Sequence, residues 1–264
     1  MTTGFAAIPA SGSYRLNNAR VPACLVTAET IASDRHGFAL LDIAVEEGAV
    51  ASLLPAGMPG LDAAQALDLD GGIVLPRLVD VHTHLDKGHI WPRRPNPDGS
   101  FMGALSAVAA DREANWSARD VRARMEFGLR CAYAHGTAAI RTHLDSLGKQ
   151  IDISWPVYAE LRAEWAGRIA LQASPLFGVD AVADPAHMQA ITRAITAHGD
   201  RLLGAVTYMV PELDAALDTL FRTAIEHGFD LDFHVDETND PSARSLEHIA
   251  DAALRHRFPG RILA

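Results

Sequence analysis

Cysteine is scarce in this sequence, with only Cys24 and Cys131 among 264 residues. Both lie in apolar stretches, so we expect buried thiols in a reducing compartment and no disulfide framework. Long apolar runs are missing too, because no stretch reaches the roughly 18 uncharged residues of a membrane span. The first residues also lack the pattern of a secretory signal. The sequence therefore predicts a cytoplasmic protein that does not enter a membrane.

Positive charge is the second shortage. Lys and Arg number 23 against 33 Asp and Glu, which gives a formal net charge of -10. Nucleic-acid-binding proteins neutralise phosphates with clustered Lys and Arg, and this sequence has no such cluster. We therefore expect no nucleic-acid partner. Hydrophobic residues at 48% and charged residues at 21% are typical of a folded globular protein.

The first part of the sequence consists of short apolar runs separated by turn residues, which is typical of β-strands. The expected strands are 23–27, 39–45, 49–54 and 66–69. We interpret residues 1–72 as a small β unit that forms the first domain.

From residue 73 onward, apolar runs alternate with stretches of helical periodicity, the pattern of βα units around a parallel sheet. The expected strands are 73–84, 138–144, 169–174, 202–209, 229–235 and 261–264, and the expected helices include 118–135, 156–165, 185–198 and 213–227. This α/β pattern fits either a doubly wound sheet or a (β/α)8 barrel. No Gly-x-Gly-x-x-Gly supports the first, and six strands are two fewer than the second requires. The barrel interpretation therefore makes residues 73–264 a domain that is incomplete at its C-terminus.

The strongest functional signal is the run LVDVHTHLD at residues 78–86, an apolar strand that ends in His-x-His. Strand side chains alternate between the two faces, so His82 and His84 project in the same direction. Two imidazoles in this arrangement are typical metal ligands. The alternative is a pair of structural histidines beside a turn.

A second strand, at residues 229–235, also ends in polar residues. His234 lies at its carboxyl end as a candidate third ligand, and Glu237 follows closely enough to move protons during hydrolysis. The alternative is that Asp232, Asp236 and Glu237 form a solvated loop face. Because both clusters fall at the carboxyl ends of strands, where barrel active sites assemble, we favour a hydrolytic site.

A third strand end places Arg141, His143 and Asp145 on one face at the same rim. One interpretation is a pocket wall, with His143 as a candidate substrate-binding residue. The other is a structural ion pair between Arg141 and Asp145. The segment 87–101, rich in Pro and Gly, is expected to form a loop that either covers a substrate or lies ordered on the surface.

Three runs, LPRLVDVHTHLDK at 75–87, GTAAIRTHLD at 136–145 and DFHVDE at 232–237, resemble the cytosine deaminase branch of the amidohydrolase superfamily. The β unit resembles the small β-sandwich that flanks the barrel in such enzymes. The resemblance implies a TIM-type (β/α)8 barrel, here with about six βα units, that binds one divalent metal ion, zinc or iron. It implies His82, His84 and His234 as the metal ligands and Glu237 as the catalytic acid/base.

The implied reaction is the hydrolytic deamination of a cytosine-like or related amino-substituted N-heterocycle, with release of ammonia. Family members often form multimers, so a homo-oligomer is compatible with the resemblance. The family supplies a further His and Asp beyond Ala264, and the Gln that reads cytosine is absent from residues 175–178. Cytosine itself is therefore not favoured.

Two rival functions stay open. A cyclic amide or N-acyl hydrolase of the same superfamily uses similar ligands, but a carboxylated lysine that would favour it is absent from the strand at 202–209. A truncated, non-catalytic paralogue is the second rival.

Overall fold

The computed structural model describes residues 7–9, 11–27, 31–59, 65–198 and 200–264. The chain divides into two compact units, Met1–Pro76 and Arg77–Ala264. Within the described residues, no helix has both the length and the apolar character needed to cross a bilayer. Cys24 is exposed and Cys131 is half-buried, so the expectation of buried thiols is wrong for Cys24.

The first unit is built on one four-stranded sheet with the order β3-β2-β1-β4. Its strands are β1 (Tyr14–Pro22), β2 (Phe38–Glu46), β3 (Ala49–Pro55) and β4 (Ala66–Asp68). Strands β1, β2 and β3 pair antiparallel, whereas β4 lies parallel to β1. A tight turn joins β2 to β3, with Glu47 at φ 49° and Gly48 at φ 78°, as the right-handed strand twist favours.

The prediction of the first strand is wrong by about one strand length. The strand is β1, and Ala23–Leu25 forms a 3-10 turn. Two features of β1 obscure its alternation in the sequence. Asn18 adopts a positive φ of 55°, and the register shifts between Leu16 and Ala19. Pro22 then ends the strand, because proline cannot donate to a ladder.

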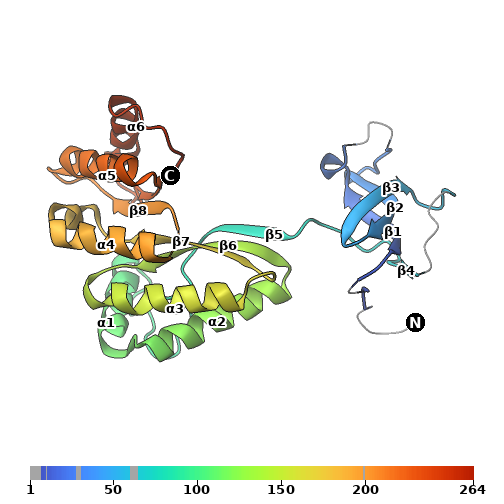
Figure 1. Ribbon diagram of the computed structural model, residues 1–264, viewed down its shortest axis with the longest axis horizontal. Coiled ribbons are helices and arrows are strands. Elements are labelled where there is room, and N and C mark those ends of the chain that lie inside the picture. The colour runs from blue at the N-terminus through green and yellow to red at the C-terminus, as the bar shows by residue number, and fades with distance from the viewer. Residues whose placement is uncertain (1–6, 10, 28–30, 60–64, 199) are drawn as a thin grey trace. The chain divides into compact units, whose positions relative to one another are not determined.

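The second unit alternates strands and helices along the chain (Figure 1). Its elements are β5 (Leu78–Thr83), α1 (Phe101–Asn115), α2 (Ala118–Ala134), β6 (Thr137–Asp145), η2 (Gly148–Gln150), α3 (Ile151–Glu164), β7 (Ala170–Leu176), η3 (Val179–Ala183), α4 (Pro185–His198), β8 (Leu202–Thr207), α5 (Leu213–His227), β9 (Asp230–Val235), α6 (Ser245–Arg255) and β10 (Ile262–Leu263). The six expected strands are all present, although β5 begins later than predicted.

All six strands are parallel and follow one another in sequence order. Strands β5, β6 and β7 form one ladder, and β8, β9 and β10 form another. A parallel bridge between Gly178 and Val206 joins β7 to β8, with Val206 N donating to Phe177 O at 2.8 Å. The unit is therefore part of a parallel α/β barrel, as the alternation predicts, and the carboxyl ends of its strands share one rim.

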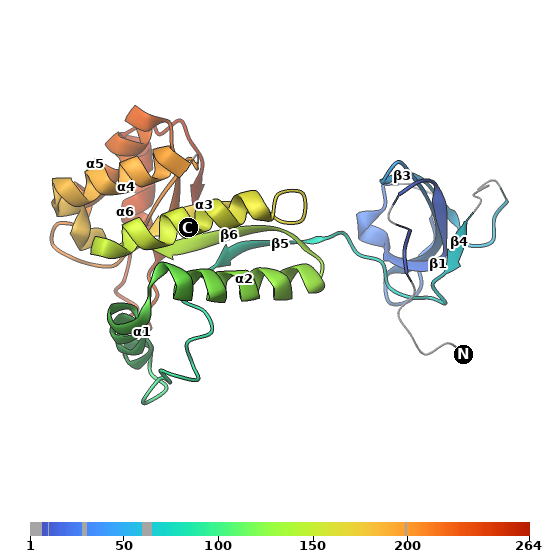
Figure 2. The same cartoon turned by 60° about the horizontal axis from the view of Figure 1, so that its bottom comes forward.

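The helices show where the sequence was informative. Ser117 and Asp184 cap α2 and α4 as expected, accepting from Asp120 N at 3.3 Å and Ala186 N at 2.9 Å. The predicted start of α3 at Pro156 is wrong, since the helix begins at Ile151. Helix α1 was not predicted. Figure 2 shows α1 almost end-on while α2 and α3 run across the view, so α1 lies crosswise to its neighbours.

The core of the second unit lies between the strands and helices α2 to α5. Its largest fully buried side chains include Trp155, Tyr158, Phe177 and Phe221. Burial of such side chains contributes roughly 1.5–3 kcal/mol each. This packing makes the strands a rigid support for the side chains at their carboxyl ends.

Candidate metal centre

Four histidines from three strands meet at the rim. His82 and His84 come from the end of β5, His143 from β6 and His234 from β9, and one ring nitrogen of each lies within 4.8 Å of those of the others. The six distances between ring centroids range from 4.4 to 5.5 Å. Parallel strands bring their carboxyl ends together, so that His84 and His234, 150 positions apart in the chain, become neighbours.

The donor atoms fit a divalent metal. His84 Nε2 and His234 Nε2 are 3.4 Å apart, and two nitrogens on one tetrahedral zinc with bonds of about 2.0–2.1 Å would be roughly 3.3 Å apart. His84 Nδ1 lies 3.4 Å from the backbone oxygen of His143. A carbonyl in this position orients a ligating imidazole and leaves its Nε2 available for the ion. The set can therefore hold a divalent metal ion.

Electrostatics favour the neutral, ligating form of these rings. Burial lowers the pKa of His84 to about 3, with further contributions from the Lys87 charge and the neighbouring histidines. Burial and the neighbouring His143 and His82 likewise lower the pKa of His234 to about 3. Burial also lowers the pKa of His82. Because metals bind neutral imidazole, these rings need not lose protons near neutral pH.

His143 is fully buried and both of its ring nitrogens have partners. Nε2 lies 3.0 Å from Asp232 Oδ1, and Nδ1 lies 3.4 Å from Thr83 O. Asp232 also accepts from Arg141 Nη1 at 2.8 Å. A direct contact between His143 and a substrate stays a prediction. The contacts observed here make it a support between β5 and β9.

Asp232 is the residue that the sequence reasoning missed. The alternative interpretation placed it on a solvated loop face, but Asp232 is 1% exposed. Burial raises its pKa, but hydrogen bonds from His143 and Arg141 outweigh this and lower the pKa overall. Its position two residues before His234, on the same strand face, was the signal available in the sequence.

The proposed ion pair between Arg141 and Asp145 is wrong. Arg141 pairs with Asp232, whereas Asp145 pairs with Lys87 at 2.8 Å and with Arg112 at 2.7 Å. Arg112 belongs to α1 and Lys87 follows the His-x-His strand, so Asp145 ties both segments to the end of β6.

A buried carboxyl group lies directly behind the ligand strand. Asp86 Oδ2 accepts from the backbone N of Asp145 at 2.8 Å, and Asp86 is completely buried. Burial raises the pKa of Asp86, and the neighbouring Asp145 charge raises it further. Arg124 donates to the backbone oxygen of Asp86 and fixes the turn after His84. These contacts preorganise the first ligand pair.

Glu237 lies just after β9 with an exposed side chain. Its charge partly opposes the lowering of the His82 pKa that burial and His143 cause. Its role in proton transfer stays a prediction. Asp236, at a φ of 49°, instead holds the start of α6 by accepting from Ser245 N at 3.0 Å and Ser245 Oγ at 2.7 Å.

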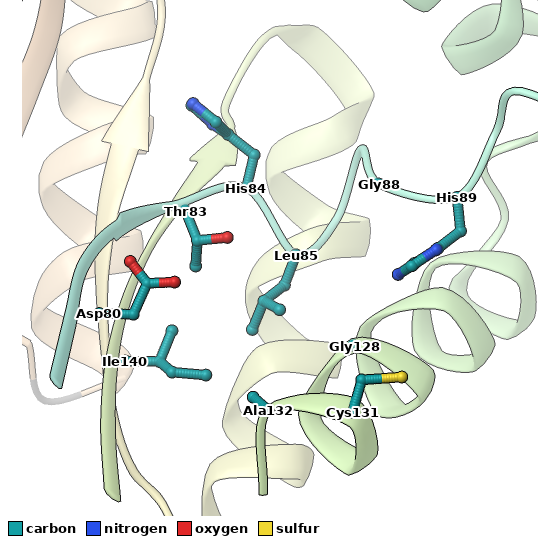
Figure 3. Close-up of a pocket in the computed structure, with 10 residues that line it drawn as sticks. All are labelled: Asp80, Thr83, His84, Leu85, Gly88, His89, Gly128, Cys131, Ala132 and Ile140. Atoms are coloured by element: carbon teal, nitrogen blue, oxygen red, sulfur yellow. The ribbon is translucent and has the colours of Figure 1, made fainter. Parts of the chain in front are cut away.

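A cavity of about 240 Å³ lies between β5, β6 and α2, lined partly by Thr83, Leu85 and Gly128. In Figure 3 the ring of His84 points away from Leu85, Gly128 and Cys131. The cavity is therefore on the helix side of β5, and His84 is the one member of the histidine cluster that lines it.

Parallel strands in barrel order, with histidines gathered at their carboxyl ends, define a barrel of the kind found in metal-dependent hydrolases. No family model matches the chain. Over all 264 residues, it is 51% identical to a pterin deaminase of Rhizobium rhizogenes (strain K84) and spans 60% of that protein's length.

Solved structures agree in fold. A 5-methylcytosine deaminase from Klebsiella pneumoniae matches 94% of the chain with a TM-score of 0.75 and 22% identity; the match covers 57% of that protein. An N-isopropylammelide isopropylaminohydrolase from Burkholderia multivorans matches 95% of the chain with a TM-score of 0.69 and 25% identity, over 60% of that protein. In sequence and in fold, the chain therefore resembles the cytosine deaminase-like branch of the amidohydrolase superfamily.

Proposed function

We propose that this protein is a metal-dependent hydrolytic deaminase that releases ammonia from an amino-substituted N-heterocycle of the pterin or pyrimidine type. The observation that carries the proposal is the facing pair of His84 and His234 nitrogens, 3.4 Å apart, beside His82. The 51% identity to a pterin deaminase supports the substrate class.

The proposed ligands are His82, His84 and His234. A divalent ion at this position supplies Lewis-acid activation of water, which lowers the pKa of that water toward neutrality. The ion is zinc or iron in this proposal, since imidazole ligands suit both. The backbone oxygen of His143 orients His84, and Asp232 in turn holds the ring of His143, so the His84 ring needs little reorganisation during the reaction.

Glu237 is the proposed acid/base. Its carboxylate takes a proton from the attacking water and delivers protons to the ring nitrogen and to the departing ammonia. The exposed position of Glu237 after β9 leaves it room to move between these atoms. General acid-base catalysis of this kind typically contributes about 10²- to 10⁴-fold in rate.

Strand β8 does not favour the rival cyclic amide or N-acyl hydrolase, which would need a carboxylated lysine on this strand. Its inward positions are Gly204 and Val206, which pair with Asp232 and His234. A Cβ on Gly204 would lie 2.3 Å from Ser174 Oγ and 2.6 Å from Asp232 O, so no longer side chain fits there.

The proposal extends to location and assembly. The free thiols Cys24 and Cys131 fit a reducing cytoplasm. A small heterocycle is the proposed partner rather than nucleic acid or membrane. Self-association is testable by light scattering on the purified protein.

The test is an ammonia-release assay on purified protein loaded with zinc or with iron, using pterin, cytosine and isocytosine. We expect turnover of at least one of them and near-stoichiometric metal by mass spectrometry. Glu237→Gln should lower kcat about 10²-fold or more with unchanged metal content, whereas the exposed Glu226→Gln should match the unaltered protein. Bound metal without ammonia release from any of them would refute the proposal and favour a non-catalytic paralogue.

A further inference from the structure

Above the histidine layer, the strands end in a polar pair that the proposed chemistry does not use. The Tyr208 hydroxyl donates to Asp180 Oδ1. Tyr208 is the first residue after β8, and Asp180 lies in η3, just after β7. The two groups therefore connect neighbouring strand ends at the rim.

Strand alternation places Tyr208 on the inner face of the barrel. Asp232 reaches His143, three strands away, so its side chain points into the barrel. Gly204 and Val206 lie opposite Asp232 and His234 and share that face. Tyr208 follows at the next inward position, roughly 6–7 Å beyond the His234 layer at about 3.3 Å per residue.

Thr207 confirms the assignment of the two faces. Its hydroxyl lies 2.9 Å from Ser245 Oγ on α6, which covers the outside of the strands. Residues 206 and 208 therefore face inward, and residue 207 faces outward.

Gly178 lies beside Asp180 and Tyr208, and its lack of a side chain leaves space for the two groups. Gly178 is bridged to Val206, and a Cβ at Gly178 would lie 2.4 Å from Asp180 Oδ1 and 2.6 Å from the Tyr208 hydroxyl. Any other residue at position 178 would displace the pair. The glycine thus leaves room for a carboxylate and a phenol at the carboxyl ends of β7 and β8, on the rim where the histidines also lie.

The pair is also too exposed to act mainly as a structural brace. Tyr208 is 40% exposed and Asp180 is exposed. A hydrogen bond between exposed groups contributes little to stability. The same groups become energetically important when a ligand covers them and excludes water.

We propose that Asp180 is a specificity-determining residue whose carboxylate accepts a hydrogen bond from a ring N–H of the heterocycle, and that Tyr208 positions that carboxylate. The inference rests on the proposed function and names the substrate edge that is recognised. Amino-substituted heterocycles with a lactam or amidine N–H beside the reacting carbon fit this acceptor. Analogues in which that N–H is methylated would leave the carboxylate unpaired.

Kinetics on a matched pair of compounds, pterin and 3-methylpterin, test this assignment. We expect Asp180→Asn to lower kcat/KM for pterin about 10- to 100-fold, mainly through KM. Asp180→Ala should reduce the preference for pterin over 3-methylpterin by at least about tenfold. Tyr208→Phe should raise KM by a smaller factor and leave kcat unchanged. Asp251→Asn, an exposed change on α6, and Tyr133→Phe, on α2, are the matched controls.

A binding measurement separates this inference from the proposed reaction. Calorimetric titration with lumazine, the deaminated product of pterin, reports recognition without turnover. Weaker lumazine binding by Asp180→Asn at unchanged metal content supports the assignment even if no ammonia is released. If Asp180→Asn matches Asp251→Asn in KM, in discrimination and in lumazine affinity, the pair is only structural and the inference is overturned.

Discussion

Asp111 on α1 holds the segment that follows β5, because it binds Arg93 of that segment. A substitution of Asp111 therefore tests how much this contact stabilises the protein. The Asp111 side chain is fully buried and accepts four hydrogen bonds. Arg93 donates at 2.9 and 2.7 Å, Trp116 Nε1 at 2.7 Å and Asn115 Nδ2 at 2.7 Å. Asp111→Asn keeps the shape but turns one acceptor into a donor that faces other donors.

The expected loss follows from these contacts. At least one charge-assisted hydrogen bond disappears at a buried site, and Trp116 is 3% exposed. Arg93 is 37% exposed and keeps Asp120 as a partner, so its contribution is discounted for solvent screening. We expect a loss of about 2–4 kcal/mol in the free energy of unfolding. At roughly 2–4 °C per kcal/mol for a unit of this size, Tm should fall by about 4–16 °C.

Calorimetry or thermal fluorescence on the two purified proteins measures the shift. The control is Glu113→Gln on the same helix, whose pair with Lys149 has side chains 78% and 60% exposed and should therefore contribute little to stability. A Tm for Asp111→Asn within the range of that control would refute the reasoning.

The pH dependence of the same variant follows from its pKa. Burial raises the pKa of Asp111, but hydrogen bonds from Arg93, Trp116 and Asn115 outweigh this and lower it overall. A lowered carboxyl pKa contributes stability that is present above the unfolded value near 3.9 and is lost as pH falls through the folded value. The difference in Tm between the variant and the original protein should therefore be constant from pH 5 to 8 and shrink below about pH 4.

Three further outcomes are expected. Burial lowers the pKa of His84 and His234 to about 3, so zinc binding at pH 7 should release almost no protons from these rings. Titration calorimetry in buffers of different ionisation enthalpy measures this release, and a value of one proton or more would contradict the prediction. For the same reason the metal-free protein should lose stability as pH falls below about 6.5, since the unfolded chain binds more protons, and denaturant melts that are flat from pH 7 to 4 would contradict this. Gly204→Ala should lower the free energy of unfolding by about 1–3 kcal/mol or more, because its Cβ would lie 2.6 Å from the backbone oxygen of Asp232. Gly88→Ala is the control, since the atom nearest to its Cβ would lie 3.6 Å away, and its Tm should be within about 1 °C of that of the original protein.

The sequence by itself determined the order and type of most elements of the second unit. Apolar runs with two-residue alternation, separated by stretches of helical period, identified β6 to β10, and Ser117 and Asp184 identified two helix starts. The His-x-His spacing and His234 at a strand end predicted three of the four histidines that meet, and His143 is the fourth. These signals are local, because alternation and capping depend on residues within one element.

Tertiary structure alone decided the partners of the charged residues. Arg141 could pair with Asp145 by sequence spacing, yet it reaches Asp232, which is 91 positions away. One of the two sequence interpretations placed Asp232 on a solvated face, whereas the packing of the parallel strands buries it against His143. The same packing brings the Tyr208 hydroxyl to Asp180, 28 positions away in the chain. Contacts across a barrel depend on how several strands pack together, and no single strand carries that information in its own residues.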